Sequence, residues 1–329
     1  MNYQPPFQLT HAMLGRVAAI AELVGAWKAA NPRELVPQLR RGNRIRTIQA
    51  SLAIEQNTLS LEQVTAVLDG KPVLGQPREI QEVLNAFAAY EALPHWQAHA
   101  LNDLLAAHGL LLRGLAEDAG QLRRGGVGIY QDGKLVHMAP PASQVPRLVD
   151  NLLHWLQHTD AHPLIASCAL HYELEFIHPF SDGNGRMGRL WQTLVLSRWQ
   201  PMLAYLPVET VIKGRQADYY RLLGEADRAA DCTAFIVFLL DAIHDALQQA
   251  MAVEPVAATP VETTVEVTVE TPERVLAVLK AHPDMTLAQV AQAIGKSQRA
   301  VERAAAALKQ EGRLRFVGAK KKGKWEVGE

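Results

Sequence analysis

The sequence is poor in cysteine, in long apolar runs and in net charge. Two cysteines in 329 residues exclude a disulfide framework or a cysteine-rich metal site. Cys168 and Cys232 both lie in apolar, helix-like stretches, so they are predicted to be buried free thiols. We expect neither an N-terminal hydrophobic leader nor an apolar run of bilayer-spanning length. We therefore expect a soluble cytoplasmic protein without a membrane partner.

The formal net charge of −1 conceals an asymmetry along the chain. Residues 272–329 contain 12 Lys/Arg and 6 Asp/Glu, a net charge of +6, whereas the preceding residues contain 21 and 28, a net charge of −7. Hydrophobic residues make up 48% of the chain, which is ample for a globular core. The length suggests about two domains, and the charge pattern predicts that the second is a distinct basic unit.

Most of the first 250 residues show helical periodicity. Residues 1–110 are predicted to form an N-terminal helical region, and residues 111–250 a second helical region that contains one β-hairpin. Residues 251–271 are rich in Val, Thr, Glu and Pro, a composition typical of an extended linker. The predicted fold is therefore mainly α, with a small α+β domain at 272–329.

Residues 272–329 resemble a winged helix-turn-helix domain. Three short helices are predicted before two strands, 314–317 and 325–327, which flank a lysine-rich tip at 318–323. The side chains expected to face outward from the third helix are those of Gln298, Arg299, Glu302 and Arg303. Winged helices bind DNA phosphates and bases, or proteins, so this unit is predicted to contact either DNA or a protein.

The most informative stretch runs from His178 to Arg189. Gly183-Asn184-Gly185 allows positive φ angles and an anion-binding nest, and the apolar periodicity after it predicts a helix whose N-terminus favours phosphate. Arg186 and Arg189 are three residues apart on its first turn, and arginine binds phosphate oxygens in pairs. His178 titrates near neutral pH, and Asp182 offers a hard carboxylate for Mg²⁺. These residues predict a general base beside a metal-bound polyphosphate.

This stretch resembles the signature of the Fic family, His-x-Phe-x-Asp/Glu-Gly-Asn-Gly-Arg-x-x-Arg, and every specified position matches. The resemblance implies a Fic-type helical bundle and a protein adenylyltransferase that moves AMP from ATP to a Ser, Thr or Tyr hydroxyl of a target protein. It implies that His178 is the base and that Asp182 holds Mg²⁺. The residues implied to bind ATP phosphates are Gly183, Asn184, Gly185, Arg186, Met187, Gly188 and Arg189. Gly183 stands where the related phosphotransferases have lysine, which favours nucleotidyl transfer.

An upstream segment resembles the inhibitory motif of the same family, Ser/Thr-x-x-x-Glu-Gly/Asn. Ser51 and Glu55 match, whereas Gln56 departs from the motif and Asn57 comes one place late. The resemblance implies that Glu55 pairs with Arg189 and prevents a productive ATP pose. Taken without it, Glu55 is a solvated or helix-capping carboxylate.

Two further segments gain a role from the same resemblance. Residues 127–137 are predicted to form a hairpin that turns at Asp132-Gly133, and they resemble the Fic flap. An unknown target protein would pair with the flap as an extended strand; the alternative is a plain surface hairpin. Tyr219 and Tyr220 lie where family members often place tyrosines near the nucleoside, and the alternative is packing.

Other functions stay open at this point. His171, Glu175 and His178 have the i, i+4, i+7 spacing of a metal-dependent hydrolase, and His154 and His158 form a second pair. Pro179 disfavours a helical His178, however, and the hydrolase would leave the nest unused. The remaining alternatives are an ATP-sensing transcription regulator and a hydrolase that removes AMP through a protonated His178. The residues also leave open whether UTP is used and whether the chain forms a homodimer.

Overall fold

Helices dominate the protein, which confirms the mainly α prediction. The computed structural model describes residues 3–30, 37–131, 134–253, 271–293, 298–310, 312–317 and 324–327. The chain divides into two compact units, Met1–Val256 and Ala257–Glu329, which are described separately. The predicted linker, the hairpin tip at 132–133 and the lysine-rich tip at 318–323 lie mostly or wholly outside the described residues.

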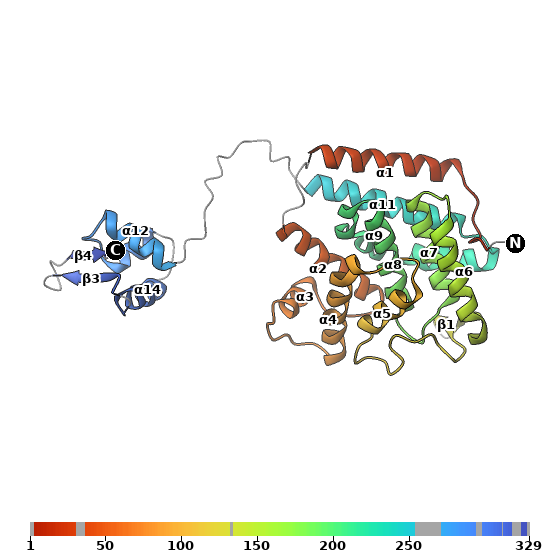
Figure 1. Cartoon of the computed structure of the whole chain (residues 1–329), viewed down its shortest axis with the longest axis horizontal. Helices are drawn as coiled ribbons and strands as arrows, with labels where there is room; N and C mark the ends of the chain where they lie inside the picture. Colours follow the sequence, from red (N-terminus) through yellow and green to blue (C-terminus); the bar gives the residue numbers. More distant parts are fainter. Residues whose placement is uncertain are drawn as a thin grey trace. The chain divides into compact units, whose positions relative to one another are not determined.

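The larger unit is a helical body with one hairpin (Figure 1). Its α-helices are α1 (His11–Ala30), α2 (Pro37–Ile54), α3 (Leu61–Leu68), α4 (Pro77–Ala92), α5 (Leu101–Leu111), α6 (Val145–His158), α7 (Pro163–Ile177), α8 (Asn184–Trp199), α9 (Val208–Gly214), α10 (Gln216–Ala229) and α11 (Thr233–Val253). Short 3₁₀ turns are η1 (Leu93–His95), η2 (Ala142–Gln144) and η3 (Pro201–Tyr205).

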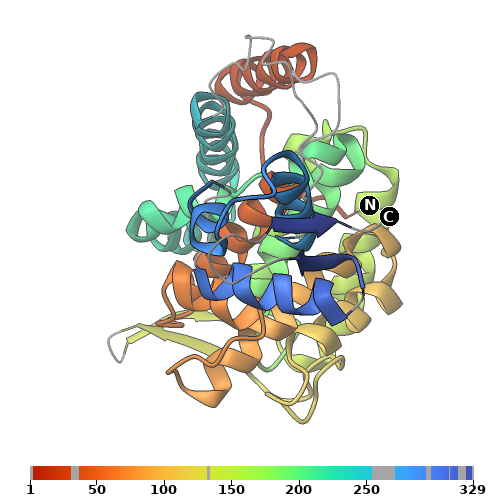
Figure 2. The same cartoon turned by 90° about the vertical axis from the view of Figure 1, so that its left-hand side faces the viewer.

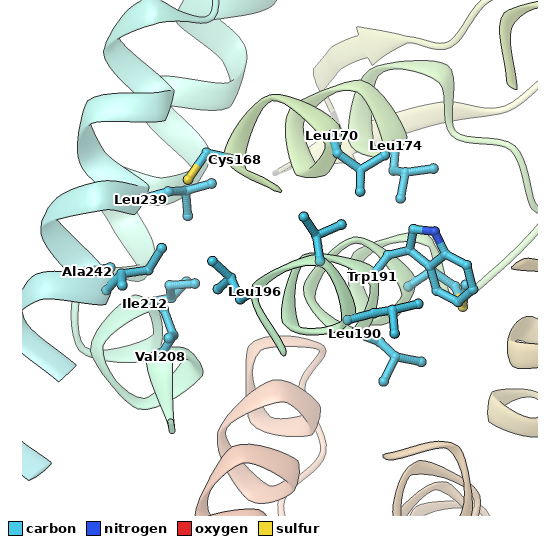
Figure 3. Close-up of a cluster of buried hydrophobic side chains, with 14 of the residues drawn as sticks. Cys168, Leu170, Leu174, Leu190, Trp191, Leu196, Val208, Ile212, Leu239 and Ala242 are labelled. Carbon is cyan, nitrogen blue, oxygen red and sulfur yellow. The ribbon is translucent and has the colours of Figure 1, made fainter. Parts of the chain in front are cut away.

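Helix α8 is the central element of this unit. Almost every residue of its first three turns is buried, and Trp191 is among the largest side chains that are fully enclosed. Figure 3 shows the apolar side chains that converge here, from α7 (Cys168, Leu170, Leu174), α8 (Leu190, Trp191, Leu196), α9 (Val208, Ile212) and α11 (Leu239, Ala242). A helix enclosed on all sides is fixed in position by its neighbours, so the residues at its N-terminus are held firmly.

The cysteine prediction is confirmed, whereas one prediction about apolar runs was wrong. Cys168 and Cys232 are free and buried. The stretch Thr233–Ala252 of α11 is long and apolar enough to cross a membrane, contrary to the expectation that no run would be. Half of that stretch is buried within the protein, where α11 runs beside α1 (Figure 1), and core helices meet the same criterion.

The predicted hairpin is present in the described strands. β1 (Gly128–Gln131) pairs antiparallel with β2 (Lys134–Met138), and the register shifts between Ile129 and Tyr130. Ala139 N–H continues the ladder by donating to the Val127 carbonyl over 3.2 Å. Figure 2 shows the hairpin, in yellow, extending away from the helices.

The smaller unit contains helices followed by a hairpin, in the predicted order. Its elements are α12 (Thr271–Ala281), α13 (Leu287–Ala293), α14 (Gln298–Gln310), β3 (Leu314–Val317) and β4 (Lys324–Val327). A separate apolar cluster holds them together, and Phe316 packs edge-on against Trp325 across the β3–β4 pair. Gln298 and Glu302 are exposed on α14 as predicted, whereas the side chains of Arg299 and Arg303 lie outside the description.

Candidate functional site

The site is built on the turn between α7 and α8, residues 178–183, which we call the α7–α8 turn. The Asn184 side chain closes this turn: its Oδ1 accepts from Phe180 N–H at 2.9 Å and its Nδ2 donates to the Phe180 carbonyl at 2.9 Å. Phe180 itself is fully buried. Because the Asn184 amide is engaged in this closure, only its backbone N–H remains to contact an anion at the helix N-terminus.

His178 stands immediately after the last residue of α7. Its backbone adopts φ 50° and ψ 62°, a left-handed conformation that is costly for a residue with a Cβ. Its Nδ1 lies 3.2 Å from the Glu175 carbonyl oxygen, which can only accept, so Nδ1 carries the proton in the neutral ring. The basic nitrogen of neutral His178 is therefore Nε2, as a general base requires.

The N-terminus of α8 provides the anion-binding end of the site. Gly183 takes φ 82°, and a Cβ there would collide with the Leu112 side chain. Both the backbone conformation and the limited space therefore favour glycine. The first intrahelical hydrogen bond runs from Met187 N–H to the Gly183 carbonyl, which leaves the preceding N–H groups directed beyond the helix end. Met187 and Gly188 lie inward: the Met187 side chain is in the core, and a Cβ at Gly188 would press on the His171 ring.

Asp182 is surrounded by hydrogen-bond donors. Its Oδ1 accepts from Gly183 N–H at 2.6 Å and from Arg186 Nη2 at 3.0 Å, and its Oδ2 accepts from Arg78 Nη2 at 3.2 Å. Arg186 also lies 3.6 Å from Glu82, and its side chain is almost fully buried. The side chain of Asp182 is 43% exposed, so its carboxylate faces both solvent and the start of α8.

Arg189 extends from the second turn of α8 into the protein, where it is only 1% exposed. Its Nε donates to Ser51 Oγ at 3.0 Å, and its Nη2 donates to the Ser51 carbonyl at 3.1 Å and to Glu55 Oε1 at 2.7 Å. Burial alone would lower the pKa of Arg189, but the Glu55 carboxylate raises it above the usual value, so the side chain stays charged. Nη1 is buried and has no hydrogen-bond partner among the described residues.

The Glu55 carboxylate covers the start of α8. A Cβ added to Gly185 would collide with Glu55 Oε1 and would lie 3.1 Å from Arg189 Nη1. One acidic oxygen therefore rests against the Cα of Gly185, at the position where a helix N-terminus attracts an anion. The structure thus brings together the four predicted residues Ser51, Glu55, Gly185 and Arg189.

The end of α2 differs from the motif but keeps a sharp stop. Gln56 takes φ 68° after the last helical turn, a conformation that glycine or asparagine adopts more readily. Asn57 follows it and fastens the chain: its Nδ2 donates to Glu82 Oε2 at 2.8 Å, and its Oδ1 accepts from Leu59 N–H at 3.1 Å. Glutamine in place of the motif's glycine or asparagine therefore strains the backbone at position 56, but Glu55 still contacts Arg189.

The two tyrosines occupy different environments. Tyr219 is buried, donates from its hydroxyl to Glu175 Oε1 at 3.2 Å and lies 3.0 Å from His171 Nε2, so it belongs to the core. Tyr220 is 40% exposed, and its hydroxyl reaches the Ile54 carbonyl at 3.4 Å, next to Glu55. Of the two tyrosines, Tyr220 is therefore the one that reaches the surface beside Glu55.

The residues of the metal-hydrolase alternative are used in other ways. Both ring nitrogens of His171 are engaged, Nδ1 with Gln192 Oε1 at 2.6 Å and Nε2 with Tyr219, and His178 has left the helix that carries Glu175. Within the described part of the chain, no three His, Cys, Asp or Glu side chains gather as a metal site. The His154 and His158 rings lie on the exposed side of α6, tilted by 35° with their centroids 4.2 Å apart.

Two residues of the site were missed from the sequence. His108 lies on α5 and stacks on Phe180 with ring centroids 3.7 Å apart; its Nδ1 accepts from Gly120 N–H at 2.8 Å, so its protonated Nε2 donates to the Asp182 carbonyl at 3.0 Å. Arg123 is buried and binds backbone carbonyls at the end of α7. Neither residue lies in a recognisable motif. Only Arg123 had a signal in the sequence, as one of the basic residues before the glycine-rich hairpin.

Comparisons with known proteins find relatives of this chain in one family. The model of the Fic/DOC family matches residues 98–196. The chain is similar to a Fic family protein of Desulfovibrio desulfuricans G20, whose crystal structure superposes with a TM-score of 0.77 at 48% identity, over 99% of this chain and 98% of that one. It is 31% identical to the protein adenylyltransferase Fic of Drosophila grimshawi over 214 residues, and 34% identical to the protein adenylyltransferase fic-1 of Caenorhabditis briggsae over 191. Those alignments cover 61% and 54% of this chain but 41% and 35% of those proteins, so the chain spans about two fifths of their length.

Proposed function

Because the chain belongs to the Fic/DOC family, we propose that it is a protein adenylyltransferase that transfers AMP from ATP to a hydroxyl group of a target protein. The observation that carries this proposal is the α7–α8 turn. A histidine with its basic nitrogen fixed as Nε2 and an anion-binding helix N-terminus are held on one closed turn. Such transfer depends on positioning and charge stabilisation more than on covalent help from the protein.

In the proposed reaction, the ATP phosphates lie over the N-terminus of α8. The backbone N–H groups of Asn184 and Gly185 and the guanidinium of Arg186 bind phosphate oxygens. The buried Nη1 of Arg189, which has no partner within the described chain, supplies a further donor for the outer phosphates. His178 Nε2 takes the proton of the target hydroxyl, whose oxygen attacks the α-phosphorus. The new bond is O–P, the broken bond joins the α-phosphorus to the bridging oxygen, and pyrophosphate leaves.

Asp182 fits the role of a magnesium ligand. It is a half-exposed carboxylate beside the proposed phosphate site, and Mg²⁺ is commonly held by one or two carboxylates together with substrate phosphates. When bound, the ion would neutralise phosphate charge. In this structure the Asp182 oxygens accept from Arg78, Arg186 and Gly183 N–H, so the contact with Arg78 would give way on metal binding.

We propose that Glu55 restrains the activity. Its carboxylate occupies the start of α8 and bonds to Arg189, so it competes with the outer phosphates of ATP for the same donors. Ser51 supports this arrangement by accepting from Arg189 Nε. The Glu55 side chain is 34% exposed, so it can leave Arg189 more easily than a core side chain could, and the proposed restraint is reversible.

The remaining parts of the chain are assigned to recognition. The β1–β2 hairpin would align an extended target segment by strand pairing, and Tyr220 would contact the nucleoside. The Ala257–Glu329 unit, with its helix–helix–helix–hairpin order and net positive charge from residue 272 on, suits a winged helix that contacts DNA or a protein. The cytoplasmic location and the homodimer stay predictions.

The test is label transfer from α-³²P-ATP with Mg²⁺, using the Glu55→Gly variant, whole lysate as the source of target and mass spectrometry of the labelled peptides. We expect labelled hydroxyl side chains, and we expect His178→Ala to lose the transfer by a factor of about 100 to 10,000 while it still binds ATP. Transfer that survives His178→Ala would refute the assignment. A salt-dependent shift of a DNA probe without any label transfer would favour an ATP-sensing regulator instead.

A further inference from the structure

Arg123 occupies a place that the proposed chemistry does not yet explain. It lies in the segment between α5 and β1, is only 3% exposed, and uses its guanidinium entirely on backbone carbonyl oxygens. Nε donates to the His178 carbonyl at 2.6 Å, and Nη2 donates to the Ile177 carbonyl at 3.2 Å and to the Pro140 carbonyl at 2.6 Å. Nη1 donates to the Gly125 carbonyl at 2.8 Å, so the guanidinium makes four hydrogen bonds to backbone carbonyls.

These carbonyls belong to two functional segments. Ile177 and His178 are the last residue of α7 and the residue after it, where helical carbonyls lack intrahelical partners and the helix dipole favours a cation. Gly125 precedes β1 and Pro140 follows β2, so they mark the two ends of the hairpin. The backbone of Arg123 adds a fifth bond, because its N–H donates to the Pro179 carbonyl at 2.9 Å.

The bond to the His178 carbonyl acts at a strained residue of the site. His178 holds a left-handed conformation with φ 50°, which persists only where surrounding contacts fix it. The orientation of its carbonyl is set by the same backbone torsions that direct its side chain and place Nδ1 near Glu175 O. Loss of the guanidinium would release His178 to other torsions and would release both ends of the hairpin together.

We propose that Arg123 is a positioning residue that couples the flap hairpin to the base: it holds His178 in its reactive conformation only while Gly125 and Pro140 are in place. Target pairing along β1–β2 would thereby be reported to His178 through one side chain. This inference rests on the proposed function for its catalytic consequence, but its structural part does not depend on it. A lysine cannot replace Arg123, because an ammonium group lacks the planar fork that reaches separated oxygens.

The chain offers a matched control. Arg124 is the next residue, carries the same charge and is exposed. The variants to compare are Arg123→Met, Arg123→Lys and Arg124→Met, each made in the full-length chain with Glu55→Gly. Thermal unfolding of each variant is measured first, and Arg123→Lys carries the test if Arg123→Met does not unfold cooperatively.

The kinetic measurement separates positioning from binding. We expect Arg123→Met to lower the single-turnover rate of AMP transfer at saturating ATP about 100-fold, since a base misplaced by about 1 Å costs on that order. The ATP concentration that gives half the maximal rate should change less than twofold, because the donors at the start of α8 are not bonded to Arg123. Arg123→Lys should be impaired in the same way but less, and Arg124→Met should match its parent.

Two measurements do not require transfer. The ¹⁵N shifts of the His178 ring, assigned by comparison with His178→Ala, should show the Nδ1–H form in the parent and a mixture of tautomers in Arg123→Met. Hydrogen exchange of peptides from residues 127–140 should accelerate about tenfold in the same variant. If the parent transfers no AMP, the proposed function fails while these two measurements still decide the role of Arg123.

Any one of three results, obtained with folded variants, would overturn the inference. The first is an unchanged His178 tautomer, and the second is faster exchange at 127–140 with no change at His178, which would remove the coupling. The third is an equal effect of Arg124→Met, which would assign the change to charge alone.

Discussion

The two ends of the α7–α8 turn are held in opposite ways. At the end of α7, a buried arginine from the same unit satisfies the helix carbonyls, and nothing in that arrangement has to leave during a reaction. At the start of α8, the helix N–H groups and Arg189 face a carboxylate whose side chain is 34% exposed and which belongs to the residue directly after α2. The proposed base is therefore fixed, whereas the proposed phosphate site is covered by a group that can be displaced.

The difference follows from the chemistry of each helix end. A C-terminus requires a cation, which the substrate does not bring, so the protein supplies Arg123 permanently. An N-terminus requires an anion, which ATP does bring, so any protein carboxylate placed there competes with the substrate. The autoinhibition proposed for Glu55 would thus use a helix end that is complementary to phosphate.

The largest expected effect comes from the side chain that joins the two ends. Asn184→Ala would remove both bonds to Phe180 and leave a buried N–H and carbonyl unpaired, at about 2 kcal/mol of stability. Because the turn sets the distance between His178 and the start of α8, we expect AMP transfer to fall about 100-fold or more. Rates are measured by α-³²P label transfer and stability by urea unfolding.

Asn85→Ala is the matched control for this substitution. The Asn85 amide is also buried and also makes two hydrogen bonds to the backbone, in its case to the Leu111 and Arg113 carbonyls, but it lies outside the turn. We expect a similar loss of stability with a much smaller loss of rate. Equal losses of rate in both variants would mean that the closed turn has no special part in the reaction.

The next effect concerns the Glu55 carboxylate that covers the start of α8. Glu55→Gly should raise the affinity for ATP on the order of tenfold, because a charge-assisted bond to Arg189 no longer has to be broken before phosphate binds. Isothermal titration calorimetry with ATP and Mg²⁺ measures this directly. Glu55→Gln keeps the shape without the charge and should fall between the two proteins, whereas Glu62→Gln, at an exposed carboxylate of α3, should bind ATP as the parent does. Unchanged affinity in Glu55→Gly would mean that Glu55 does not compete with phosphate.

A third prediction concerns how the folding stability depends on pH through a histidine that binds the α7–α8 turn. Burial lowers the pKa of His108, which binds as a neutral ring to Gly120 N–H and to the Asp182 carbonyl. The unfolded chain therefore takes up a proton near pH 6.5 before the folded one does, so stability is complete above that pH and falls as the pH decreases below it. Each pKa unit of difference corresponds to about 1.4 kcal/mol.

We expect urea unfolding between pH 8 and pH 5 to show a smaller acid loss of stability for His108→Gln than for the parent. His158→Gln, at an exposed histidine of α6, shows what a histidine substitution does without burial. Parallel curves for the parent and His108→Gln would show that His108 is not held neutral by the fold.

The sequence predicted the two ends unequally. The residues of the turn and the pairing partner of Arg189 were accessible because each lies in a compact motif whose spacing is visible along the chain. Arg123 and His108 were not, because they act on backbone carbonyls 55 and 74 residues away, and a backbone carbonyl leaves no trace in the identity of the residue that carries it. The same reason hid the role of the Asn184 side chain, which was expected at the phosphates and instead closes the turn.

The smallest expected effect lies at Gln56, where the inhibitory motif departs from its usual residue. A left-handed backbone costs a non-glycine residue about 1–2 kcal/mol, and glycine gives back part of that gain as unfolded-chain entropy. Gln56→Gly should therefore raise the free energy of unfolding by about 1 kcal/mol, measured by urea unfolding. Gln56→Ala keeps the strained torsion and should show no gain.

Gln56→Gly should affect ATP binding as well as stability, because residue 56 follows the Glu55 carboxylate that covers the start of α8. Relaxed torsions at residue 56 stabilise the end of α2 in the geometry that sets Glu55 against Arg189, so ATP should bind more weakly in Gln56→Gly, within about threefold of the parent. Stabilisation together with tighter ATP binding would mean that the strain at Gln56 holds the carboxylate in place. The difference between a fixed base and a displaceable cover would then depend on strain at both positive-φ residues, Gln56 and His178.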